Sequence, residues 1–267
     1  MSDVLDRETI VLALAVSTRA QVQHLSVAQQ TASTQIDALA APVPVQGCAV
    51  FFADRQTAGS GRRGRTWVSP PSANLYMSVS RRFTGAPAAL SGLSLAVGVA
   101  LAEAINTAEL CGATRVGVKW PNDLVVGQRK LGGILIELRA GVDAGTDAAI
   151  GIGINVRMPP EAGAQIDQPW CDLAQIAAEL ISRNALAATL LDGLLPALEQ
   201  FDTSGLTGFV SRWQALDSIV GQPVRILDGP RTHEGIALGI TDAGALLLAQ
   251  GGQERAFHGG EVSLRSA

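Results

Sequence analysis

The order of hydrophobic and polar positions divides the chain into strands and helices. Short apolar segments predict strands at 47–53, 117–120, 130–138 and 148–156. Alternation of apolar and polar residues predicts a further, half-buried strand at 74–83. Residues 1 to 22 are weakly patterned and predict one short helix. Strands therefore dominate the first half of the chain.

Three stretches carry the spacing of helices that bury one face. Leucine and valine recur at helical spacing from residue 90 to residue 101, inside an uncharged run of 20 residues, 83–102. This length suffices to cross a membrane, but the run is rich in Ala, Gly and Ser and contains Pro87. We therefore interpret it as a core helix. Two more helices are predicted at 184–201 and 206–216.

The pattern changes beyond residue 217, where short strand candidates alternate with turn residues. These candidates lie at 224–227, 235–240, 245–249 and 255–257. We therefore predict an α+β fold with an N-terminal extension (1–21), a larger domain (22–218) and a small C-terminal β-barrel (219–267). A domain of about 50 residues is only marginally stable by itself, so we expect the C-terminal barrel to pack on the larger domain.

A loop rich in glycine and arginine follows the predicted strand at 47–53. Residues 59–64, Gly-Ser-Gly-Arg-Arg-Gly, match the G-x-G-x-x-G spacing of dinucleotide sites, but Pro70 and Pro71 oppose the helix that such a site needs. The loop instead offers guanidinium groups that can bind phosphate or carboxylate, and a flat face, Trp67, that can stack on a purine. A solvated basic loop with Trp67 in the core is the alternative.

Arginine greatly outnumbers lysine, because 18 of the 20 cationic residues are arginines and only Lys119 and Lys130 are lysines. Lys119 ends a predicted strand beside Trp120, so we expect its ammonium to point into a cavity and stabilise a transferring phosphoryl group. Lys130 is expected as a charge at a hairpin edge. Asp123 follows a proline and is either a turn residue or a magnesium ligand.

Charge and cysteine content limit the compartment and the partners. A net charge of −4 argues against a nucleic-acid coat or a polybasic membrane anchor. Three distant cysteines, Cys48, Cys111 and Cys171, suggest neither a disulfide framework nor a zinc site. The apolar run at 10–16 follows acidic residues, whereas a secretory signal needs a positive start. We therefore expect a cytoplasmic protein.

Taken together, the motifs resemble those of the biotin protein ligases over residues 22 to the end. They are Ala-Ser-Thr-Gln at 32–35, the loop 56–67, Lys-Trp-Pro-Asn-Asp at 119–123, Lys-Leu-Gly-Gly-Ile at 130–134 and Gly-Ile-Gly-Ile-Asn-Val at 151–156. The resemblance implies a mixed β-sheet flanked by helices, as in class II aminoacyl-tRNA synthetases, followed by a Src-homology-type barrel.

The resemblance also implies a two-step reaction. The biotin carboxylate would attack the α-phosphate of ATP, accompanied by Mg²⁺, to give biotinyl-5′-AMP. A lysine of the biotin carboxyl carrier protein of acetyl-CoA carboxylase or a related carboxylase would then displace AMP. Neither nucleic acid nor membrane is an expected partner, and a homodimer is left open.

Site roles follow residue by residue from the same resemblance. Arg62 and Lys119 are expected to be catalytic, holding the biotin carboxylate and the α-phosphate. The other biotin contacts are Ser33, Thr34, Gln35, Gln56, Gly59, Ser60 and Gly61. The nucleotide contacts are Arg63, Arg65, Trp67 and Asn155, with Asp123 as the metal ligand. Gln35 replaces the asparagine, and Ser60 the arginine, that are common in the family, which puts retention of the adenylate in doubt.

Three further interpretations bear on function. About 22 residues precede the resemblance, too few for the winged helix-turn-helix of bifunctional relatives, so we expect a monofunctional ligase. A lipoate-protein ligase would use the same adenylation chemistry, although the Lys-Trp-Pro-Asn-Asp segment and the terminal barrel favour biotin. A non-catalytic sensor of biotinyl-adenylate is the alternative outside enzymes.

Overall fold

The computed structural model describes residues 3–108, 110, 114–141, 145–177, 182–258 and 261–264. Within them a seven-stranded sheet has the order β1-β2-β3-β7-β6-β5-β4, in which β1 and β2 pair in parallel and the other neighbours are antiparallel. The strands are β1 (Val22–Ala28), β2 (Cys48–Ala53), β3 (Leu75–Phe83), β4 (Gly117–Lys119), β5 (Asp123–Val126), β6 (Arg129–Ala140) and β7 (Thr146–Ile154). The predicted mixed sheet is confirmed.

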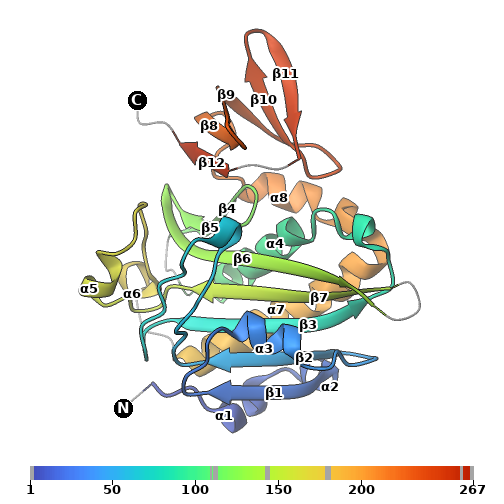
Figure 1. Cartoon of the computed structure of the whole chain (residues 1–267), viewed down its shortest axis with the longest axis vertical. Coiled ribbons are helices and arrows are strands. Elements are labelled where there is room, and N and C mark those ends of the chain that lie inside the picture. Colours follow the sequence, from blue (N-terminus) through green and yellow to red (C-terminus); the bar gives the residue numbers. More distant parts are fainter. Residues whose placement is uncertain are drawn as a thin grey trace.

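Helices cover both faces of this sheet (Figure 1). On one face lies the main core, built with α4 (Leu93–Thr107), α7 (Arg183–Ser204) and α8 (Val210–Leu216). On the other face α3 (Thr34–Ala40) covers a small apolar patch that includes Phe51. The short helices α5 (Pro160–Gly163) and α6 (Leu173–Ile176) follow β7. The three predicted helical stretches are thus confirmed, with a 3-10 turn at Gly205–Gly208 before α8.

Strand β3 differs from its prediction, because both of its faces are buried. Leu75, Met77 and Val79 point into the main core, while Ser78 and Ser80, on the opposite face, are equally inaccessible. The hydroxyl-bearing residues made the strand look half-exposed to solvent. They instead face the side of the sheet where α3 and a large cavity lie.

The apolar segment 87–107 is, in the described part of the chain, long and apolar enough to cross a membrane by length and composition. It consists of a 3-10 turn (Pro87–Leu90) and α4, and most of the α4 side chains are buried. The helix packs against α7 closely enough that a Cβ on Gly193 would lie 2.8 Å from the methyl group of Ala104. The prediction of a core helix is confirmed.

The N-terminal residues form two helices, α1 (Arg7–Ala13) and α2 (Val16–Gln21), so the prediction of one short helix is wrong. The chain is extended at Leu14, and the amide of Ala15 donates to the Asp192 carboxylate on α7, which separates the two helices. Leu5, Ile10 and Leu14 are buried in the main core. This segment is therefore packed into the larger domain.

The C-terminal residues form a second, antiparallel sheet of order β11-β10-β9-β8-β12, at the opposite end of the long axis from the N-terminus (Figure 1). Its strands are β8 (Pro223–Asp228), β9 (Arg231–Ile240), β10 (Leu246–Gln250), β11 (Gln253–Phe257) and β12 (Glu261–Leu264). The indole N–H of Trp120 donates to the Gly244 carbonyl at 3.0 Å, which ties this module to the larger domain. The predicted small barrel is confirmed.

Two cysteines lie deep in the fold as free thiols, Cys48 and Cys171. Desolvation raises the pKa of Cys48 to about 12 and that of Cys171 to about 11, against smaller lowering effects of Arg81 and Arg129. We expect neither thiol to react with iodoacetamide at about pH 8 until denaturant is added, because both remain protonated and buried. Peptide mapping separates them from Cys111, which lies outside the described residues. Rapid labelling of either thiol in the folded protein would contradict this expectation.

Candidate active site

A cavity of about 890 Å³ opens on the α3 face of the large sheet. It is lined by all of the predicted site residues except Gly59 and Arg63. Gly151 and Gly153 of β7 line it, and their lack of side chains lets two other lining residues pack directly on the strand. A Cβ on Gly151 would lie 2.7 Å from Gln35 Oε1, and one on Gly153 would lie 2.5 Å from the indole of Trp67. The glycines of β7 therefore separate two regions of one cavity.

At one end, a continuous chain of polar side chains runs across the sheet. Gln56 Oε1 accepts from the amide and the hydroxyl of Thr34, at 2.9 and 3.2 Å. The hydroxyls of Thr34 and Ser78 lie 2.9 Å apart, and Ser78 donates to Gln35 Oε1 at 3.2 Å. Gln35 Nε2 donates in turn to Glu137 and to a backbone carbonyl of β7. This buried network can bind a small polar head group with both donors and acceptors.

The same end is joined to the glycine-arginine loop. Ser33 begins α3 and accepts a hydrogen bond from the amide of Gln35 at 3.2 Å. Gln56 Nε2 donates to Ser69 Oγ at 3.1 Å, and Ser69 donates to the carbonyl of Trp67 at 2.8 Å. The loop and the polar end are therefore positioned as one unit.

Cationic side chains occupy the middle of the cavity. Arg62 Nη1 donates to Asn122 Oδ1 at 3.2 Å, and Asn122 Nδ2 donates to the carbonyl of Ile134 at 2.7 Å. Lys119 ends β4, lines the same cavity and lies just before the cis peptide bond between Trp120 and its proline. The wall of the cavity therefore carries positive charge of the kind that can stabilise a transferring phosphoryl group.

The aromatic side chain of Trp67 also lines the cavity. The alternative interpretation, in which Trp67 is purely a core residue, is therefore wrong. The ammonium of Lys130 lies 5.4 Å from its ring centroid and 2.7 Å from Asp123 Oδ1. Lys130 also lines the cavity, so its interpretation as a hairpin-edge charge is wrong. The reason is that its side chain turns inward over the indole.

Asn155 lies just beyond β7 and connects several segments around this aromatic end. Its side-chain amide donates to the Cys171 carbonyl at 3.0 Å, its backbone amide donates to the Leu131 carbonyl at 2.9 Å, and its own carbonyl accepts from Leu173. Only 3% of Asn155 is exposed. Asn155 therefore lines the cavity and also fixes its wall.

Two of the predicted contacts are not brought to the cavity. Arg63 lies in the 3-10 turn Arg62–Gly64 with a φ of 57°, in the left-handed region, and does not line the cavity. Gly59 packs against the later part of its own loop, since a Cβ there would lie 2.7 Å from both Ser69 Oγ and the carbonyl of Trp67. Their roles in binding remain predictions.

Several lining residues were not predicted from the sequence. Asn122, for which no role was predicted, lines the cavity and links the two motifs. Glu137 closes the polar chain without lining the cavity. Leu227 of the C-terminal sheet and the segment 165–170 before α6 also line the cavity. No motif marks that segment, although a proline and a tryptophan, Pro169 and Trp170, lie at its end.

A metal ion held by protein side chains finds little support in the described residues, which contain no group of three or more His, Cys, Asp or Glu side chains able to bind one. The carboxylate of Asp123 is already paired with the Lys130 ammonium at 2.7 Å. A lysine at this distance compensates the charge that would attract Mg²⁺.

Comparison with known proteins adds an independent line of evidence. Residues 27–155 match the Biotin/lipoate A/B protein ligase family, and residues 219–265 match the Biotin protein ligase C terminal domain. The chain is 45% identical over 216 residues to the Bifunctional ligase/repressor BirA of Escherichia coli, covering 81% of this chain and 66% of that protein. It therefore spans about two thirds of that relative's length.

Other relatives are covered almost completely. The Biotin--[acetyl-CoA-carboxylase] ligase of Paracoccus denitrificans is 35% identical over 225 residues, which are 82% of this chain and 91% of that one. The structure of the biotin protein ligase from Aquifex aeolicus in complex with biotin and ATP superposes with a TM-score of 0.76 at 27% identity, covering 92% of this chain and all of that one. The chain belongs to the biotin protein ligase family.

Proposed function

We propose that this protein is an ATP-dependent ligase that forms biotinyl-5′-AMP and transfers biotin to a lysine of a biotin carboxyl carrier protein. The observation that carries the proposal is that three kinds of chemistry line one cavity. They are a buried polar network that includes Thr34, the cations Arg62 and Lys119, and the indole of Trp67. These groups suit the head group, the acyl phosphate and the adenine of the adenylate.

In the first step, a carboxylate oxygen of biotin would attack the α-phosphorus of ATP, and pyrophosphate would leave with the electron pair of the broken P–O bond. Arg62 and Lys119 would hold the two anionic groups together and offset the negative charge of the transition state. In the second step, the carrier lysine amine would attack the biotinyl carbonyl, and AMP would leave. The glycine-arginine loop would cover the cavity and protect the mixed anhydride of the adenylate from water.

We also propose the surroundings of this reaction. Mg²⁺ would enter with the phosphates of ATP, as is usual for nucleotide substrates. The acceptor would be the carrier protein of acetyl-CoA carboxylase or a related carboxylase, in keeping with the names of the relatives. The protein would act in the cytoplasm, without nucleic acid or membrane, and gel filtration coupled to light scattering would show whether it is a homodimer.

Exchange of labelled pyrophosphate into ATP tests the first step and its substrate. We expect exchange that depends on biotin and that lipoate does not support. Exchange stimulated by lipoate and not by biotin would instead assign a lipoate-protein ligase. Tight binding of added biotinyl-5′-AMP, with neither exchange nor transfer to a carrier, would favour the non-catalytic adenylate sensor.

The Arg62→Gly variant should retain the adenylate less well, because it loses the contact with Asn122 and one of the two central charges. We expect dissociation of biotinyl-5′-AMP to be about tenfold faster, the effect of losing one charge-assisted hydrogen bond. A rapid-dilution chase measures this rate. Bystander proteins should also become biotinylated, while the enzyme itself offers few acceptors, since it has only two lysines. An unchanged dissociation rate would remove Arg62 from this role.

A further inference from the structure

Both ends of the glycine-arginine loop meet at one carboxylate. The loop, defined here as residues 55–71, starts directly after Asp54 and ends directly before Ser72. Asp54 Oδ2 accepts from the backbone amide of Ser72 at 3.0 Å and from its hydroxyl at 3.1 Å. Ser72 has a φ of 55°, in a region that residues other than glycine rarely adopt, so these bonds hold an unfavourable conformation in place.

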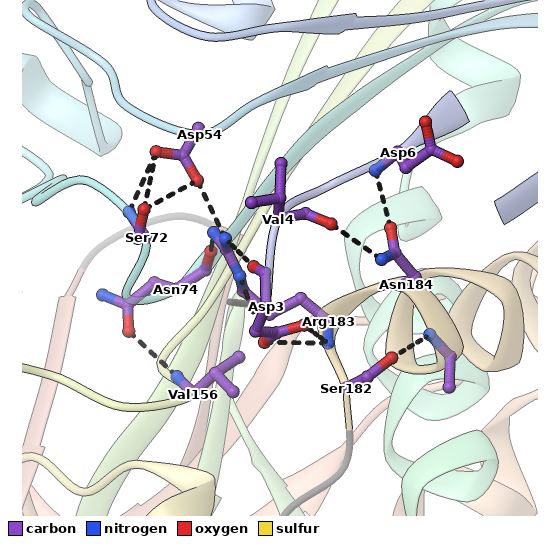
Figure 2. A network of polar contacts seen from close by, with 11 residues as sticks. Asp3, Val4, Asp6, Asp54, Ser72, Asn74, Val156, Ser182, Arg183 and Asn184 are labelled. Carbon is purple, nitrogen blue, oxygen red and sulfur yellow. Dashed lines mark hydrogen bonds and ion pairs between the residues drawn. The ribbon is translucent and has the colours of Figure 1, made fainter. Parts of the chain in front are cut away.

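This carboxylate is itself held by a buried arginine, as Figure 2 shows. Arg183, at the start of α7, is 1% exposed and donates from Nη2 to Asp54 Oδ1 at 2.8 Å. Its Nη1 donates to the carbonyl of Asn74 at 3.2 Å, at the start of β3. Asp3 completes the guanidinium's surroundings through its carbonyl and through an ion pair. One side chain therefore fixes the start of the loop and the strand that follows it.

The contacts extend to the nucleotide end of the cavity. Asn74 Oδ1 accepts from the amide of Val156 at 2.9 Å, directly after Asn155. Neither Asp54, Ser72, Asn74 nor Arg183 lines the cavity, so none of them can contact a bound substrate directly. Their influence on the reaction must act through the loop and the end of β7.

The middle of the loop makes hydrogen bonds of its own. The amides of Gly61 and Trp67 donate to the carbonyls of Arg65 and Gly59, and Arg62 Nη1 donates to Asn122 in the Lys-Trp-Pro-Asn-Asp segment. In a buried setting an arginine-carboxylate pair keeps a well-defined geometry, and removing one partner leaves an uncompensated charge. The ends of the loop therefore determine how firmly it stands over the cavity.

We infer that Arg183, Asp54 and Ser72 form a clamp that positions the glycine-arginine loop and thereby retains the adenylate. The clamp is a positioning device and takes no part in bond making. The inference rests on the proposed ligase function for its consequence, while the clamp itself is a property of the fold. Loosening it should open the loop, which carries Arg62, and leave Lys119 at the end of β4 in place.

Trypsin offers a test that does not depend on catalysis, because the loop carries arginines at 62, 63 and 65. In the Asp54→Asn and Ser72→Ala variants we expect native-state cleavage at these arginines to be about tenfold faster than in the parent protein. Ser72→Ala removes the hydroxyl bond and keeps a side chain at the same unfavourable φ, so it weakens the loop end and is expected to fold even where Asp54→Asn does not.

The matched control is Asn184→Ala. Asn184 is the neighbour of Arg183, binds the amide of Asp6 and the carbonyl of Val4, and does not touch the loop (Figure 2). Its variant should lose stability in thermal melts without faster loop cleavage. Equal cleavage rates in the clamp variants and in a control of equal melting temperature would overturn the clamp.

A second readout connects the clamp to the reaction. In the clamp variants biotinyl-5′-AMP should dissociate about tenfold faster, with a smaller fall in the rate of adenylate formation at saturating substrates, because Lys119 stays in place. Faster loop cleavage with unchanged dissociation would overturn the role in retention. If the parent protein formed no biotinyl-5′-AMP, the proposed function would fail, and the cleavage experiment would still decide whether the clamp exists.

Discussion

Replacing Lys119 by alanine is expected to slow biotinyl-5′-AMP formation about a thousandfold, the usual cost of losing an electrostatic stabiliser of the transition state. Lys119 is the last residue of β4 and lines the cavity. It is also the first residue of the motif whose Asn122 contacts Arg62. Single-turnover formation of labelled adenylate, measured by rapid quench at saturating biotin and ATP, gives the rate directly.

Two companion variants isolate the cause. Lys119→Arg keeps the charge but replaces a compact ammonium by a planar guanidinium, and we expect it to recover only part of the rate. Lys130→Ala removes the other lysine, which pairs with Asp123 and lies over Trp67. It should weaken ATP binding and leave the adenylation rate at saturation nearly unchanged. A Lys119→Ala enzyme with parental turnover would exclude Lys119 from the mechanism.

Substitution of either of two glycines on β7 is the second change expected to have a large effect. Each substitution should raise the KM for a different substrate. In Gly153→Ala the new methyl group would collide with the indole of Trp67, and in Gly151→Ala it would collide with Gln35 Oε1. We expect Gly153→Ala to raise the KM for ATP about a hundredfold, the cost of misplacing a binding group by about 1 Å. Gly151→Ala should raise the KM for biotin, with a much smaller change for ATP.

Steady-state pyrophosphate exchange with each substrate varied in turn measures both constants. Gly98→Ala on α4 is the control, because its nearest neighbours would lie at 3.6 Å, an ordinary contact distance. It should change neither KM. Equal changes in both constants for both β7 variants would contradict the division of the cavity into a biotin end and a nucleotide end.

Much of this architecture was predictable, because apolar periodicity marks core elements directly. The central strands and α4 carry runs that only a buried position explains. The edge strand β1 was missed because residues such as Gln23 and His24 are exposed and interrupt its apolar pattern. Strand β5 was missed because Asp123, its first residue, looks like part of a turn.

The site was predictable where short motifs carry it and not where distant residues complete it. Glu137 and Gln35 are 102 positions apart, and Arg183 and Asp54 are 129 positions apart. No local pattern reports such pairs. Composition did point to the lysine segment, but it could not show that the side chain of Lys130 turns inward over Trp67.

The central claim is that one cavity both makes the adenylate and delivers it to a carrier. The most direct measurement incubates the protein with ATP, Mg²⁺, biotin and an apo carrier domain, followed by intact-mass and peptide mass spectrometry of the carrier. We predict one added biotinyl group on a single carrier lysine, none when ATP is omitted, and far less within the same time when Lys119 is replaced by alanine. A carrier that gains no mass, while a known biotin ligase modifies the same preparation fully, would contradict it.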